Sequence, residues 1–106
     1  MISAKEMKAN ALKAYYEGKL FAQNPSRDIC FRDEEDYVCA LGASMSFEEA
    51  ETIYYELSVF ENEDLANELQ LAHDNWYAVA ETDPTGYEAM RRKAKFLKLL
   101  TEETTT

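Results

Sequence analysis

The residues of this 106-residue chain with the greatest chemical potential are its one histidine, its two cysteines and a neighbouring carboxylate: His73, Cys30, Cys39 and Asp74. These four side chains could bind zinc, which takes thiolate, imidazole and carboxylate ligands. Cys39 and His73 could instead form a nucleophile and its base. The spacing supports neither chemistry, because the sequence has no paired Cys-x-x-Cys or His-x-x-x-His ligands and no glycine elbow. We expect no metal and no cofactor, and a histidine hydrogen-bonded at the edge of the core.

Other catalytic signatures are missing as well. The sequence contains no phosphate-binding loop, no GxGxxG turn and no GxSxG elbow. Carboxylates are so numerous that no pair stands out as a general acid and base. The sequence therefore predicts a protein that is not an enzyme.

The charge distribution is the most informative feature. The chain has 11 basic and 21 acidic residues, a net charge of −10. Residues 1–20 and 84–106 each carry +2, whereas residues 21–83 carry sixteen acids and two arginines, a net charge of −14. Repulsion at this density destabilises the folded chain, and a partner with a basic surface would relieve it. A surface so poor in lysine and arginine is not expected to grip nucleic acid directly.

The acids of the middle segment gather in three groups, two at predicted helix starts and one at a turn. The expected partner-binding carboxylates are Asp33, Glu34, Glu35, Asp36, Glu48, Glu49, Glu51, Glu61, Glu63 and Asp64. Tyr54, Tyr55 and Phe60 are candidate aromatic anchors, because a few aromatic residues usually carry most of the binding energy. The alternative is a solvated acidic surface, since acids complement helix dipoles and turns tolerate charge.

Four amphipathic helices are expected to position these residues. Ser3 and Ser46 each precede a glutamate by three residues, the spacing of a capping box, and open helices over 3–16 and 46–57. Gly18 offers a stop after the first helix. Asn62 caps a third helix that runs to about Ala80. The predicted apolar face of the second helix is Phe47, Ala50, Ile53, Tyr54 and Leu57.

A last helix follows a cap at Asp83 or at Thr85. Its predicted apolar stripe is Tyr87, Met90, Ala94, Leu97 and Leu100. Residues 29–32 and 37–40 have strand composition on either side of an acidic turn, which predicts a β-hairpin packed on the helices. The second run could instead enter a helix through Leu41 and Gly42. The expected fold is one mainly α domain over 1–106, a compact bundle of about four helices with a small β-hairpin.

Several short segments resemble a broad group of small phage and prophage proteins. The shared pattern is a helix ending in Gly18-Lys19, a short strand over 29–32, an aromatic-Cys-x-Leu-Gly segment over 37–42, and a later Asn-Asp-type helix over 71–75. This chain has Cys39-Ala40 where a Cys-Cys pair is common. The resemblance implies no catalytic residue. It implies a setting in which small acidic phage proteins, such as many anti-CRISPR proteins, bind a host complex.

The expected function is therefore a non-enzymatic, phage-type, anti-CRISPR-like inhibitor of a bacterial defence complex. Its acidic surface would act as a DNA mimic and occlude a basic nucleic-acid-binding or subunit interface. The expected partner is a host protein or ribonucleoprotein complex in the bacterial cytoplasm, with no membrane involved, and the protein would be a monomer or a homodimer. Two cysteines are too few for a secreted disulfide scaffold, although a Cys30–Cys39 bridge remains open.

The alternative function is a small acidic structural or regulatory adaptor. Such a protein would self-associate or bind a host protein through an apolar patch made of Tyr54, Tyr55, Val59 and Phe60.

Overall fold

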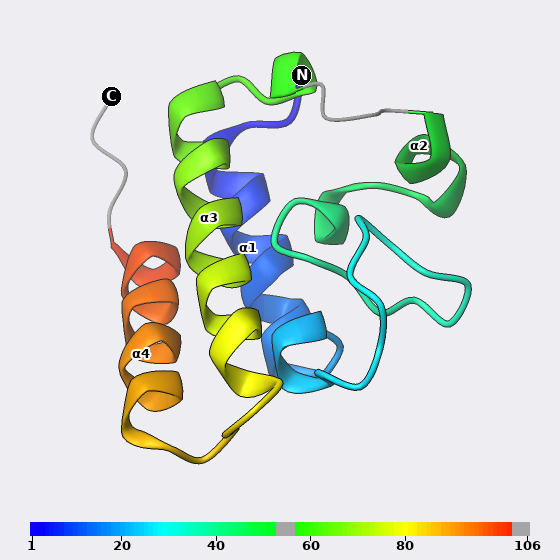
Figure 1. Cartoon of the computed structure of the whole chain (residues 1–106). Coiled ribbons are helices and arrows are strands. Elements are labelled where there is room, and N and C mark those ends of the chain that lie inside the picture. Colours follow the sequence, from blue (N-terminus) through cyan, green and yellow to red (C-terminus); the bar gives the residue numbers. More distant parts are fainter. Residues whose placement is uncertain (53–56, 103–106) are drawn as a thin grey trace.

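The structure, a computed structural model, describes residues 1–52 and 57–102. Its helices are α1 (Ala4–Tyr16), α2 (Phe47–Thr52), α3 (Glu63–Ala80) and α4 (Tyr87–Thr101), with short 3-10 turns η1 (Phe21–Gln23), η2 (Gly42–Ser44) and η3 (Leu57–Val59) (Figure 1). The described part of the chain is thus mainly helical, with four α-helices, as the sequence predicted. Among these helices, none is both long enough and apolar enough to cross a bilayer.

Side-chain caps begin the first three helices as predicted. The Ser3 hydroxyl accepts the N–H of the third residue of α1 at 3.1 Å. Ser46 and Glu49 form a reciprocal capping box before α2, with bonds of 3.2 and 3.0 Å. The Asn62 side chain accepts a backbone N–H three residues into the start of α3 at 3.0 Å. Gly18 follows α1 with φ of +70°, the left-handed conformation that glycine adopts readily.

The predicted start of α4 is wrong. Neither Asp83 nor Thr85 caps this helix, whose N-cap is Gly86, a residue without a capping side chain. The N–H of Gly86 donates to the carbonyl of Asp83 at 3.2 Å, so a turn closes before the helix can begin.

The predicted apolar stripe of α4 is also largely wrong. Tyr87 is 83% exposed, Met90 is 50% exposed, and Ala94 is exposed as well. Leu100 is buried and Leu97 packs partly buried against the core, as predicted. Ala89 and Phe96, outside the predicted stripe, are buried. Apolar residues recur at helical spacing along two adjacent stripes of this helix, so periodicity alone does not select the buried one. Contact with α3 selects it, because the Phe96 ring lies against that helix.

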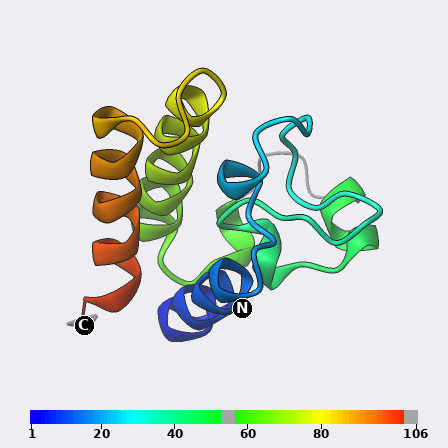
Figure 2. The same cartoon turned by 90° about the horizontal axis from the view of Figure 1, so that it is seen from below.

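Helices α1, α3 and α4 each contact the other two, with α3 and α4 running antiparallel (Figures 1 and 2). The rings of His73, Trp76 and Phe96 meet at centroid distances between 5.8 and 6.4 Å. Lys8 on α1 is buried, and its Nζ donates to the carbonyl of Glu102 at 2.8 Å. A cation at that place complements the C-terminal end of the α4 dipole.

The predicted β-hairpin is wrong, since no strand forms anywhere in residues 1–52 and 57–102. Val38 makes only isolated bridges, to Leu20 and to Arg32. Val38 through Leu41 are all buried, whereas a half-buried ribbon would alternate between buried and exposed residues. The strand-like composition of residues 38–41 therefore reflects their burial in the core. Ile29, in the other predicted strand, is exposed.

The second predicted helix is only partly described. Helix α2 ends at Thr52, and Leu57 begins the 3-10 turn η3 instead of continuing the helix. The predicted face residues Ile53 and Tyr54 lie outside the described residues.

Candidate protein-binding surface

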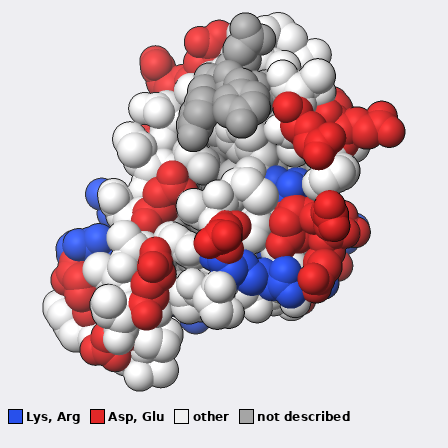
Figure 3. All heavy atoms as spheres, turned by 45° about the vertical axis from the view of Figure 1, so that its right-hand side comes forward, with Lys and Arg blue, Asp and Glu red and all other residues white. Residues whose placement is uncertain are grey.

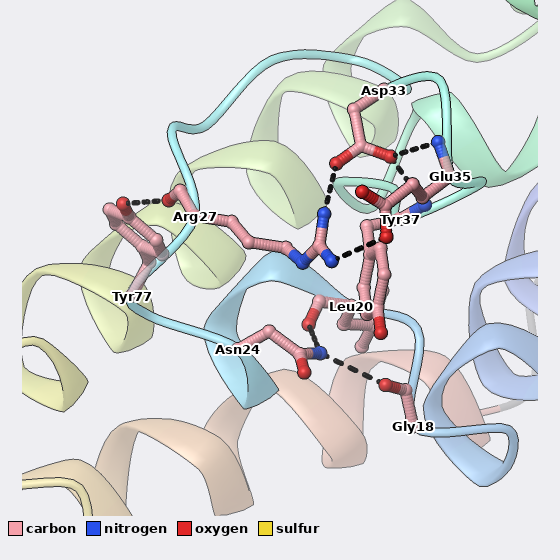
Figure 4. A network of polar contacts seen from close by, with 8 residues as sticks. All are labelled: Gly18, Leu20, Asn24, Arg27, Asp33, Glu35, Tyr37 and Tyr77. Atoms are coloured by element: carbon pink, nitrogen blue, oxygen red, sulfur yellow. Dashed lines mark hydrogen bonds and ion pairs between the residues drawn. The ribbon is translucent and has the colours of Figure 1, made fainter.

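The first acidic group, the acidic turn 33–36, forms ion pairs within its own chain segment, and Figure 4 shows those of Arg27. Arg27 pairs through Nη1 with Asp33 Oδ2 at 3.0 Å and through Nη2 with Glu35 Oε2 at 2.7 Å. Its guanidinium carbon lies 3.7 Å from the ring centroid of Tyr37, a cation–π contact. Two of the four carboxylates of the acidic turn thus share one arginine, which offsets one of their two negative charges.

The backbone of the acidic turn is shaped by its own side chains. Asp33 Oδ1 accepts the N–H groups two and four residues further on, at 2.9 and 3.0 Å. Partial burial raises the pKa of Asp33, but these N–H bonds and the Arg27 guanidinium outweigh it and hold the pKa below its usual value. Asp36 has φ of +65°, which aspartate tolerates better than most residues. Arg32 pairs with Asp36 at 2.9 Å and donates to the Met45 carbonyl at 2.6 Å.

The expectation that all four carboxylates of the acidic turn meet a partner stays a prediction, and the structure shows which of them already pair within the chain. Asp33, Glu35 and Asp36 each have an arginine partner. Glu34 is exposed and has no ion pair with any described residue.

The second acidic group lies on α2. Glu48, Glu49 and Glu51 are all exposed, and none pairs with a cation within the described ranges. The backbone N–H of Ser46, and then its hydroxyl, hydrogen-bond Glu49 and lower the pKa of its carboxyl. Glu49 therefore stabilises the start of α2 as part of its capping box, whereas Glu48 and Glu51 have no capping role among the described residues.

The structure brings these two groups to one face. A cavity of about 870 Å³ is lined by Asp33 and Glu34 of the acidic turn, by Ala50 and Glu51 of α2, and by Asp74 of α3, among others. The acidic turn and α2 both lie on the right-hand side of Figure 1, and Figure 3 shows acidic side chains gathered in groups on that face. We call the acidic turn, the α2 carboxylates and Asp74 the acidic face.

The third acidic group lies elsewhere. Glu61, Glu63 and Asp64 are exposed at the start of α3, where they complement the dipole of that helix. None of the three lines the cavity, and the turn η3 lies between them and α2 along the chain (Figure 1). The structure therefore separates this group from the acidic face.

The aromatic anchors do not form a described surface. Phe60 is fully buried, and the backbone of Ile2 bonds to the residues on either side of it, so it is not available to a partner. Val59 is partly buried against the core. Tyr54 and Tyr55 lie outside the described residues. Phe60 is therefore not available to the apolar patch through which the adaptor alternative would self-associate or bind a host protein.

His73 lies in the core, deeper than the sequence predicted. It is fully buried, its Nε2 accepts the N–H of Ala22 at 3.2 Å, and its Nδ1 lies 3.1 Å from Asp74 Oδ1. A neutral ring that donates from Nδ1 and accepts at Nε2 satisfies both partners. His73 therefore ties η1 to α3. Across the described ranges, no three side chains of metal-binding type gather at one place.

The two cysteines are free and differ in environment. Burial raises the pKa of Cys39 to about 12, so its thiol stays protonated near neutral pH. Cys30 is exposed, although partial burial and the nearby Asp33 charge raise its pKa as well. The sequence offers Cys39 and His73 as a possible nucleophile and base. A buried thiol that stays protonated is a poor nucleophile, so the structure does not favour this pair.

We expect a thiol reagent to modify Cys30 alone in the folded protein at pH 8, and Cys39 only after unfolding in urea. Mass spectrometry of peptides after timed alkylation measures both rates. Equal rates at the two cysteines in the native protein would contradict the buried position of Cys39.

Comparison of this chain with protein families, with curated proteins and with solved structures finds no match.

Proposed function

We propose that this protein is a non-enzymatic binding protein that docks its acidic face on a basic surface of another macromolecule. One observation carries the proposal: two acidic groups from separate parts of the chain flank a single cavity. Glu34 and Glu51 line this cavity without an ion pair to the described residues, and Glu48 adds an exposed carboxylate on the same helix as Glu51. Unpaired charges of one sign on one face repel each other and attract a partner of the opposite sign.

The proposed partner is a host protein or ribonucleoprotein complex with a basic groove. Carboxylates presented on a rigid face can occupy positions that phosphates of a nucleic acid would take, so docking would occlude the groove. The setting of a phage-type inhibitor of a bacterial defence complex is the one that the resemblance to small phage and prophage proteins implies. Such docking is steered by charge and weakens as salt rises.

A pair of matched double variants tests this proposal. Glu34→Lys with Glu51→Lys reverses two charges at the cavity, and Glu17→Lys with Glu81→Lys makes the same change elsewhere. Glu17 and Glu81 are exposed helix C-caps, where lysine is favourable. Both proteins then carry a net charge of −6 in place of −10.

Each protein is immobilised and exposed to a bacterial lysate at low and at high salt. We expect the wild type and the Glu17/Glu81 variant to retain the same partner at low salt and to release it at high salt. The Glu34/Glu51 variant should bind that partner about tenfold more weakly, as loss of two attractive pairs implies. Equal retention by both variants would show that the acidic face does not dock.

A further inference from the structure

We infer that the cavity beside the acidic turn receives an apolar side chain of the partner, flanked by lysine or arginine residues. This inference rests on the proposed function and names what the acidic face would recognise. It follows from two features of the cavity: apolar walls that remain partly in solvent, and carboxylates among its lining residues.

The apolar walls come from both sides of the cavity. Ile29 is 39% exposed although it is a large aliphatic residue. Phe47 and Ala50 of α2 line the opposite side, and this six-residue helix has no fully buried residue. Apolar surface left in water is unfavourable, and an inserted apolar side chain would cover it. The cavity volume of about 870 Å³ holds an aromatic or leucine side chain together with the stems of its neighbours.

The charge around the cavity selects the flanking residues. Four carboxylates line it, from Asp33, Glu34, Glu51 and Asp74. The one cation among its described lining residues is Arg32, whose guanidinium already pairs with an aspartate and a carbonyl outside the lining. A segment with acidic flanks would be repelled, and one with neutral flanks would leave Glu34 and Glu51 uncompensated, since Asp33 already pairs with Arg27. Lysine or arginine beside the apolar residue complements them.

Gln70 of α3 forms part of the cavity wall. Its Nε2 lies 3.3 Å from Asp74 Oδ1, and its side chain also hydrogen-bonds the buried Cys39 thiol. These two contacts hold the amide in the wall, behind the place that an inserted side chain would take.

Three synthetic nine-residue peptides test the inference: one with a central phenylalanine between lysines and arginines, one with alanine at the centre, and one with phenylalanine between glutamates. Cys30 lines the cavity and is exposed, whereas Cys39 is buried, so the alkylation rate of Cys30 reports occupancy. The peptides are compared by calorimetry and by protection of Cys30 from N-ethylmaleimide.

We expect the basic phenylalanine peptide to bind about tenfold more tightly than its alanine counterpart. At ten times its Kd it should slow alkylation of Cys30 about tenfold. The acidic peptide should do neither. Protein alkylated at Cys30 beforehand should lose the preference for phenylalanine, while a Cys30→Ser variant should keep it.

Two results would overturn the inference. If the two basic peptides bind equally and leave the alkylation rate of Cys30 unchanged, charge alone governs binding. The proposed function then stands, but the cavity takes no part in it. If no peptide binds, the cavity does not accept such a segment. The immobilisation experiment with the matched lysine variants then tests the proposed function separately.

Discussion

Replacing Gly42 with alanine is expected to destabilise the protein by about 3 kcal/mol or more. A Cβ at this position would overlap the backbone carbonyl of Phe31. That carbonyl cannot shift freely, because it also accepts the N–H of Cys39 at 3.1 Å. The variant would therefore push the buried segment 38–42 away from Phe31, which lines the cavity, and would disturb the cavity wall.

Gly18→Ala is the matched control for this prediction. Gly18 has open space around its Cα but a φ of +70°, so alanine there meets backbone strain and no collision. We expect a cost of about 1 kcal/mol. Urea unfolding followed by the fluorescence of Trp76 gives both values. Equal losses in the two variants would mean that the close approach at Gly42 does not constrain the fold.

Replacing His73 with phenylalanine is expected to cost about 2 kcal/mol in unfolding free energy. Phenylalanine preserves the ring that packs against Trp76 and Phe96. It removes the acceptor for the Ala22 N–H, which would stay buried without a partner. The cost therefore measures the hydrogen bond more than the packing.

Asp74→Asn is the control for this histidine. The asparagine oxygen can still accept from Nδ1, and the Asp74 side chain is 42% exposed, so the change should stay within about 0.5 kcal/mol. The same urea titration compares the two. A His73→Phe variant as stable as the wild type would contradict a structural role for the Nε2 bond.

The starts of α1, α2 and α3 were predictable because their capping signals are local. Ser46 and Glu49, for example, satisfy one another across three residues of the sequence, and no distant contact is needed. The buried face of α4 and the path of residues 37–42 depend on contacts between distant segments. Phe96 is buried against α3, and Gly42 fits against Phe31, and neither neighbour is visible in local spacing.

The candidate site shows the same division. The acidic groups were visible as charge runs, whereas the Arg32–Asp36 pair forms across a non-helical turn, where i,i+4 spacing carries no signal. The double pairing of Arg27 depends on the shape of the acidic turn. The contribution of Gln70 to the cavity depends on how α3 packs beside it, which no local pattern encodes.

A competition titration tests the docking of the acidic face most directly. The captured partner is loaded with a labelled oligonucleotide, and increasing amounts of wild-type protein or of the Glu34/Glu51 lysine variant are added. We expect the wild type to displace the oligonucleotide and the variant to do so only at about tenfold higher concentration. A partner that binds the wild type while keeping its oligonucleotide would contradict occlusion of a nucleic-acid groove.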